Sequence, residues 1–113
     1  MKPKIRKLWV EALRSGRFKK GRGQLKIGDR YCCLGVLSEL YNDCHKEKLN
    51  LVGEEMLSTK VIEWAGFSYV DPVLLTENHL GMRLSGINDG DDKLFPRPTF
   101  KLIADLIEKH DCV

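Results

Sequence analysis

The sequence predicts an α+β fold in which three or four helices pack on a small antiparallel sheet. Apolar residues recur at helical spacing in several segments, and polar and apolar residues alternate across residues 24–32. The chain has 113 residues, of which 42% are hydrophobic. We expect a chain of this length to form one domain over residues 1–113 and to bury its own core without metal ions or disulfides.

The first helix is expected from Lys4 to Ser15. One apolar stripe follows helical spacing through this segment and contains Ile5, Leu8, Trp9, Ala12 and Leu13. Trp9 is therefore interpreted as a core residue. Gly16 is well placed to end the helix.

Residues 24–32 predict a tight β-hairpin. Residues 24–27 alternate polar and apolar side chains, as a half-buried strand does. Gly28 and Asp29 follow as a two-residue turn, and this order suits a type II′ turn better than type I′. Residues 30–32 then return as the second strand.

The period changes to that of a helix from Cys33 to Cys44. This is the most apolar predicted helix, so we expect it at the centre of the fold. Gly35 lies inside it, and glycine costs a helix about 1 kcal/mol relative to alanine. The expected compensation is the close approach of another backbone, such as that of the hairpin.

The remaining segments are assigned in order along the chain. Residues 45–56 are expected to form a loop, followed by a short helix over 59–65 with Ser58 as its cap and Gly66 after its end. Residues 67–76 are ambiguous, and residues 79–87 fit both alternation and helical spacing; we favour a short strand or an irregular segment there. Residues 88–92 are interpreted as a turn, and the last helix is expected over 99–110.

Charge is unevenly distributed along the chain. The net charge is +3, yet residues 1–30 hold eleven lysines and arginines against two carboxylates, and residues 31–113 hold eight against fourteen. Such an asymmetry attracts phosphates or acidic protein surfaces, and it equally allows pairing with the chain's own acidic half.

The candidate site for a partner or a phosphate lies in this basic segment. Phe18 and Tyr31 are available there for stacking on bases, but Gly21 and Gly23 lack the spacing of known phosphate loops. The alternative is a merely solubilising loop. The candidate binding residues are Arg14, Arg17, Lys19, Lys20, Arg22, Lys26 and Arg30.

The four cysteines give little support to metal binding or catalysis. Cys33 and Cys44 would lie about 16 Å apart on one helix, too far to share a zinc ion, and no C-x-x-C occurs. We expect buried thiols, with Cys112 the most exposed. Cys32 at a helix start beside Arg30 is a possible nucleophile with a lowered pKa, but no histidine is brought to it. No catalytic residue, metal or cofactor is assigned, and the protein is interpreted as more plausibly a non-enzyme.

Several motifs resemble one protein family. The residues that match are 8–16, 21–25, the Tyr-Cys-Cys-Leu-Gly-Val-Leu run at 31–37, 64–66, 87–89 and 100–108. They resemble a family of small uncharacterised proteins from tailed bacteriophages and prophages. This chain departs from the pattern in a longer link over residues 90–98. The resemblance implies a phage or prophage origin, an accessory role and no known activity.

The expected function is that of a small accessory protein that binds and modulates a host or phage protein. The alternative is a nucleic-acid-binding protein that uses the basic loop and hairpin over residues 17–30. No run of 18 apolar residues occurs, so we expect no membrane span and a cytoplasmic location in the host cell.

Overall fold

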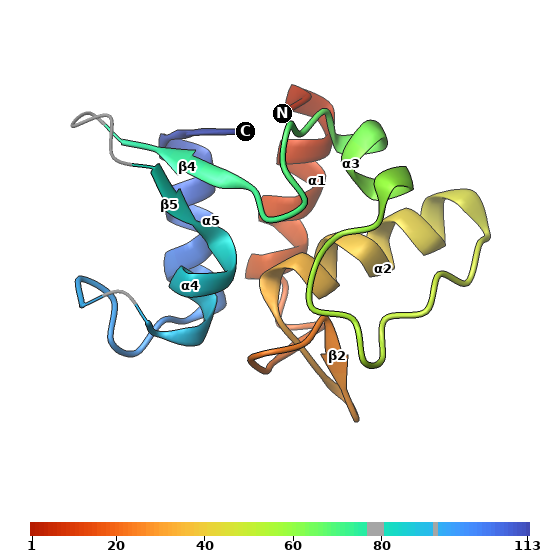
Figure 1. Cartoon of the computed structure of the whole chain (residues 1–113), viewed down its shortest axis with the longest axis horizontal. Helices are drawn as coiled ribbons and strands as arrows, with labels where there is room; N and C mark the ends of the chain where they lie inside the picture. Colours follow the sequence, from red (N-terminus) through yellow and green to blue (C-terminus); the bar gives the residue numbers. More distant parts are fainter. Residues whose placement is uncertain (77–80, 92) are drawn as a thin grey trace.

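The computed structural model describes residues 1–76, 81–91 and 93–113. Its helices are α1 (Pro3–Arg14), α2 (Cys33–His45), α3 (Thr59–Ala65), α4 (Leu84–Asp89) and α5 (Phe100–Lys109). Its strands are β1 (Lys19–Lys20), β2 (Lys26–Ile27), β3 (Arg30–Tyr31), β4 (Val73–Leu75), β5 (Gly81–Arg83) and β6 (Asp111–Cys112). The predicted α+β class is confirmed, and α1 lies between α5 and α2 (Figure 1).

Two small three-stranded sheets replace the one that was expected. In the first, with order β1-β3-β2, β2 and β3 form the predicted antiparallel hairpin and β1 adds in parallel on the other side of β3. Gly28 has a φ of 58° and Asp29 does not have a positive φ, as the expected type II′ turn requires. In the second, with order β5-β4-β6, all pairs are antiparallel.

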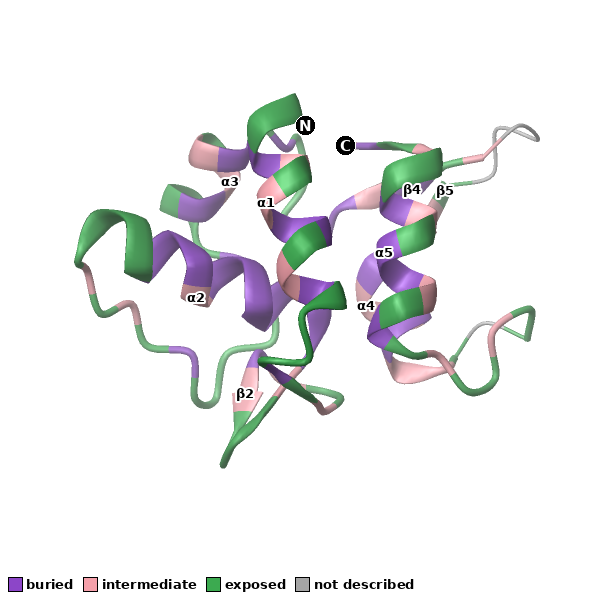
Figure 2. Ribbon diagram, turned by 180° about the vertical axis from the view of Figure 1, so that it is seen from behind, coloured by how far each residue is buried: buried purple, intermediate pink, exposed green. Residues whose placement is uncertain are grey.

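The core forms around α2, which is buried along most of its length (Figure 2). Trp9 of α1 is fully buried, as predicted, and its indole Nε1–H donates to the Cys33 carbonyl oxygen at 2.9 Å. This bond satisfies the one polar atom of a large apolar side chain and fixes α1 against the start of α2.

Gly35 lies where two backbones meet. A Cβ atom on this residue would lie 1.8 Å from the Leu25 carbonyl oxygen, at the start of the hairpin. The expected close approach of the hairpin backbone is therefore confirmed. The approach brings the hairpin directly against the first turn of α2.

The described residues after 80 form a strand followed by a helix, and these are the two structures that the apolar pattern over residues 79–87 fitted. Residues 81–83 form β5, and α4 begins at Leu84; residues 79 and 80 lie outside the described residues. The expected turn over 88–92 is wrong at its start, because α4 continues through Asp89 and Gly90 ends it in the left-handed region; Asp92 is not described. Buried Asp71 accepts hydrogen bonds from the Ser85 amide at 3.1 Å and from the Ser85 hydroxyl at 2.5 Å. This distant carboxylate caps α4.

None of the helices in the described part of the chain is long and apolar enough to cross a membrane.

Candidate functional site

Arg14 lies at the end of α1 and faces α5. Its guanidinium donates to Asp105 at 2.7 Å and to Glu108 at 3.0 Å. The hydrogen bond from Arg14, together with its positive charge, holds the pKa of Glu108 below its ordinary value. This predicted binding residue is thus paired with carboxylates of the C-terminal helix.

Two further cations of the predicted site are paired in the same way. Arg17 Nη2 lies 2.9 Å from Asp43 Oδ2 at the exposed end of α2, and Lys19 Nζ lies 2.9 Å from Asp29 Oδ2 in the hairpin turn. Lys19 lowers the pKa of Asp29. Three of the seven predicted binding residues, Arg14, Arg17 and Lys19, are therefore paired with carboxylates of the chain itself, as the alternative interpretation of the charge asymmetry allowed.

Lys20 points into the protein rather than away from it. Its ammonium donates to the Asn88 carbonyl oxygen at 2.6 Å, and partial burial lowers the pKa of Lys20. Burial has this effect because the charged form of an amine loses hydration.

Asn88 is fully buried and ties three segments together. Its Oδ1 accepts from the Cys33 amide at 3.0 Å, and its Nδ2 donates to the Gly21 carbonyl oxygen at 3.0 Å. Asp89 Oδ1 accepts from the Gly23 amide at 3.0 Å, and the Gly21 amide donates to Tyr31. Both glycine amides of the loop are therefore occupied by groups of the protein itself.

Two of the predicted cations, Arg22 and Arg30, line a shallow hollow around Ile27 at the hairpin. Arg22 and Arg30 have no carboxylate within ion-pair distance among residues 1–76, 81–91 and 93–113. Arg30 Nη1 donates to the Lys20 carbonyl oxygen at 3.2 Å. A shallow hollow of about 350 Å³ is lined by Lys20, Gly21, Arg22, Ile27 and Arg30. We call Arg22, Ile27 and Arg30 the hairpin face.

Ile27 was not among the predicted site residues. The alternation over residues 24–27 places Ile27 on the same side of the strand as Leu25, yet Leu25 is buried and Ile27 is exposed, so no signal in the sequence marked it. Ile27 leaves 51% of its surface exposed, and Val52 and Leu94 are more exposed still, so its exposure alone does not identify a site.

The predicted stacking residues are only partly available. Phe18 is buried and packs edge-on against Tyr31, with ring centroids 5.0 Å apart. Lys26 Nζ lies 5.2 Å from the centre of the Tyr31 ring. Phe18 therefore belongs to the core, and Tyr31 is partly covered by cations and Phe18.

Cys32 is not an activated thiol. Its sulfur caps α2 by accepting from the Gly35 amide at 3.4 Å, yet burial raises the pKa of Cys32 instead of lowering it. His45 stands at the opposite end of α2, about 20 Å away along the helix axis. The expected lowered pKa is wrong because desolvation outweighs the helix dipole, and the proposal of a Cys32 nucleophile loses its chemical basis.

The exposure of the cysteines also differs from the expectation. Cys112 is fully buried because β6 pairs with β4, and this burial raises the pKa of Cys112 to about 12. Cys44, near the end of α2, is the exposed thiol.

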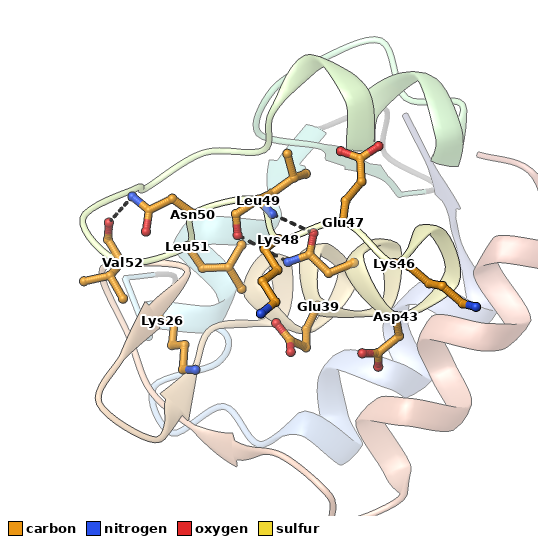
Figure 3. Close-up of a pocket in the computed structure, with 11 residues that line it drawn as sticks. Lys26, Glu39, Asp43, Lys46, Glu47, Lys48, Leu49, Asn50, Leu51 and Val52 are labelled. Atoms are coloured by element: carbon orange, nitrogen blue, oxygen red, sulfur yellow. Dashed lines mark hydrogen bonds between the residues drawn. The ribbon is translucent and has the colours of Figure 1, made fainter.

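A larger groove of about 710 Å³ runs between α2 and the loop that follows it (Figure 3). Asn42 holds this loop by donating to the Leu49 carbonyl oxygen at 3.2 Å and accepting from the Leu49 amide at 3.0 Å. Figure 3 shows side chains of both signs along the groove, including Lys26, Lys48 and Glu39. Because the charges are mixed, this groove selects neither an anion nor a cation.

Acid is expected to weaken the ion pairs of the basic segment. The pKa of Glu108 is lower in the folded protein than in the unfolded chain, so its contribution to stability is present at neutral pH and is lost as the pH falls through the folded-state pKa. Urea unfolding at pH 7 and at about pH 3 measures this loss. Arg14→Gln should lose less stability between these pH values than the original protein. An equal loss in both proteins would contradict the assignment.

The fold and the site together define a small α+β protein whose basic N-terminal segment is held by ion pairs and by the buried Asn88. The chain belongs to a family described as a domain of unknown function, DUF8296, whose model matches residues 1–111. No curated protein and no solved structure matches the chain. The expectation of a family without an assigned activity is thus confirmed.

Proposed function

We propose that this protein is a phage-derived accessory protein that binds and modulates a host or phage protein through the hairpin face. The observation that supports the proposal is Ile27, which leaves 51% of its surface exposed in a hollow that Arg22 and Arg30 also line. Arginines and buried apolar anchors supply most of the binding energy at protein–protein contacts.

The partner that fits this face is an acidic segment with an apolar side chain. The apolar group would cover Ile27 and enter the hollow of about 350 Å³, while carboxylates would pair with Arg22 and Arg30. The hydrogen bond from Arg30 to the Lys20 carbonyl oxygen restrains the guanidinium before a partner arrives. Less side-chain entropy is then lost on binding.

Nucleic acid is the second candidate, because Arg22 and Arg30 line one hollow at the hairpin and Lys26 lies 5.2 Å from the ring of the half-buried Tyr31. The ion pairs of Arg14, Arg17 and Lys19 and the inward-facing ammonium of Lys20 argue against it. Affinity for nucleic acid rises with the number of phosphates that cations neutralise. A cation already engaged within the protein contributes little to that number.

The phage or prophage origin is part of the same proposal and rests on the sequence resemblance. Residues 31–37 and the asparagine and aspartate neighbours at 88 and 89 belong to the motifs that carry it. Both motifs have structural roles here, since the first builds the start of α2 and the second holds the basic loop. An accessory protein of this kind would act in the cytoplasm of the host cell.

Capture of the partner tests the hairpin face. We expect Ile27→Asp, and separately Arg22→Glu with Arg30→Glu, to weaken capture from a bacterial host extract by about thirtyfold or more. Lys101→Glu with Lys109→Glu introduces the same charge change on α5 and serves as the matched control. Bound protein is quantified by mass spectrometry.

Equal capture by the hairpin variants and the control would refute the proposed face. Mobility-shift assays on single- and double-stranded probes at low salt separate the two candidate functions. A shift that Arg22→Glu with Arg30→Glu abolishes would favour nucleic acid as the partner.

A further inference from the structure

Another groove, lined by none of the residues of the hairpin face, has a different chemical character. It has a volume of about 490 Å³, within the range of small-molecule sites. Its wall on the α1 side contributes Lys2, Lys4, Ile5, Lys7, Leu8 and Glu11, and its other wall contributes Cys44, His45 and Trp64 from the end of α2 and from α3. We call this cavity the α1 groove.

One wall of the α1 groove is cationic. Lys2, Lys4 and Lys7 are exposed, and none of them forms an ion pair within the described part of the chain. Glu11 is the acidic residue that lines this groove. In contrast to the basic segment of residues 14–20, these charges remain available to a ligand.

The opposite wall is aromatic and is held in place. His45 stacks on Tyr41 with centroids 4.0 Å apart, and the Trp64 ring lies edge-on at 5.6 Å from His45 and 5.5 Å from Tyr41. The Tyr41 hydroxyl donates to Glu47, and Glu47 is paired with Lys60 at 3.0 Å. A chain of contacts thus fixes the aromatic wall without using the α1 lysines.

Within residues 1–76, 81–91 and 93–113, His45 forms a hydrogen bond through Nδ1 and none through Nε2. Its Nδ1 lies 2.9 Å from the Tyr41 carbonyl oxygen, which can only accept, so Nδ1 carries the proton of that bond. In the neutral ring Nε2 is then an acceptor for an N–H group of a ligand.

We propose that the α1 groove binds a nucleoside phosphate. The separation of cations on one wall from aromatic rings on the other matches a ligand with an anionic end and a flat ring. Lysine ammonium groups bind phosphate as point charges, and rings of all bases stack on aromatic side chains. The Lys2 amide donates to the Ala65 carbonyl oxygen at 2.8 Å, and this bond joins the two walls at one end of the groove.

Tryptophan fluorescence and calorimetry test this proposal with ADP as the probe. Trp9 is fully buried and Trp64 is half-buried, so a ligand in the groove should quench Trp64 selectively. Lys4→Glu with Lys7→Glu should weaken ADP binding at least about tenfold, because two exposed cations are reversed. Lys101→Glu with Lys109→Glu, the same charge change on α5, should leave the affinity unchanged.

Two truncated probes distinguish the parts of the site. Adenosine lacks the phosphates and pyrophosphate lacks the ring, and each should bind at least about tenfold more weakly than ADP. The proposal is overturned if ADP does not bind, if pyrophosphate binds as tightly as ADP, or if both double variants weaken ADP equally. Circular dichroism of each variant confirms that the exposed substitutions leave the fold intact.

Discussion

Gly35→Ala is expected to destabilise the protein by about 3 kcal/mol, as severe overpacking does. The new methyl group would lie 1.8 Å from the Leu25 carbonyl oxygen and 2.6 Å from its carbon, both of which are backbone atoms. The hairpin cannot easily move away, because the Leu25 amide donates to Glu54 at 2.7 Å and its carbonyl oxygen accepts from Cys32 at 3.3 Å. Urea unfolding measures the loss.

Gly86→Ala is the matched control for this prediction. Gly86 lies inside α4 without a positive φ, and a Cβ atom on this residue would have no neighbour within 4 Å outside its own helix backbone. Alanine should therefore be neutral or stabilise the protein by up to about 1 kcal/mol, through helix propensity and reduced freedom of the unfolded chain. If the two substitutions had equal effects, the close approach at Gly35 would be disproved.

Asn88→Ala is expected to cost about 3 kcal/mol, because it leaves buried groups without partners. The Cys33 amide lies in the first turn of α2 and has no acceptor within the helix, so it loses its partner when Asn88 is replaced. The Gly21 carbonyl oxygen loses a donor. Hydrogen exchange should become faster at the amides of Cys33 and of the basic loop. The free energy of unfolding is measured by urea titration.

Asn50→Ala controls for the loss of an ordinary asparagine. Asn50 is exposed and its side chain donates to the Val52 carbonyl oxygen at 3.0 Å, so the change in stability should stay within about 0.5 kcal/mol. If Asn88→Ala changed the free energy of unfolding as little as Asn50→Ala and left hydrogen exchange at the Cys33 amide unchanged, the hydrogen bonds of Asn88 would not be what holds the basic loop.

The sequence predicts well those elements whose causes are local. The cap at Ser58 accepts the expected amide bond from Val61. The hairpin and its turn follow from alternation and from the Gly-Asp order. Gly35 shows that even a contact between elements is predictable when a residue is costly in its own helix and only close packing explains it.

Elements that depend on distant partners were not predictable in the same way. The parallel pairing of β1 with β3 and the pairing of β6 with β4 join residues whose alignment the sequence does not encode locally. The helix α4 depends on Asp71, which lies fourteen residues before Ser85. Cys112 was expected at an exposed end because nothing local shows that its strand pairs with Leu74.

The candidate site also combines properties that the sequence predicts with contacts that depend on distant residues. The count of cations in residues 1–30 is a sequence property, but the carboxylates that pair with Arg14 and Arg17 come from α5 and α2. Asn88 lies 67 residues after Gly21 in the chain and still donates to it. Only the structure separates the cations that are paired with carboxylates from Arg22 and Arg30, which have no ion pair in the described part of the chain.

The most direct test of the hairpin face is photo-crosslinking from position 27. A photoreactive phenylalanine analogue replaces Ile27 in one protein and Lys101 in another, and both are irradiated in a bacterial host extract. We expect one protein to be crosslinked from position 27 and not from 101, and Arg22→Glu with Arg30→Glu to abolish that product. Identical products from both positions, or only nuclease-sensitive products from position 27, would contradict a protein-docking role for this face.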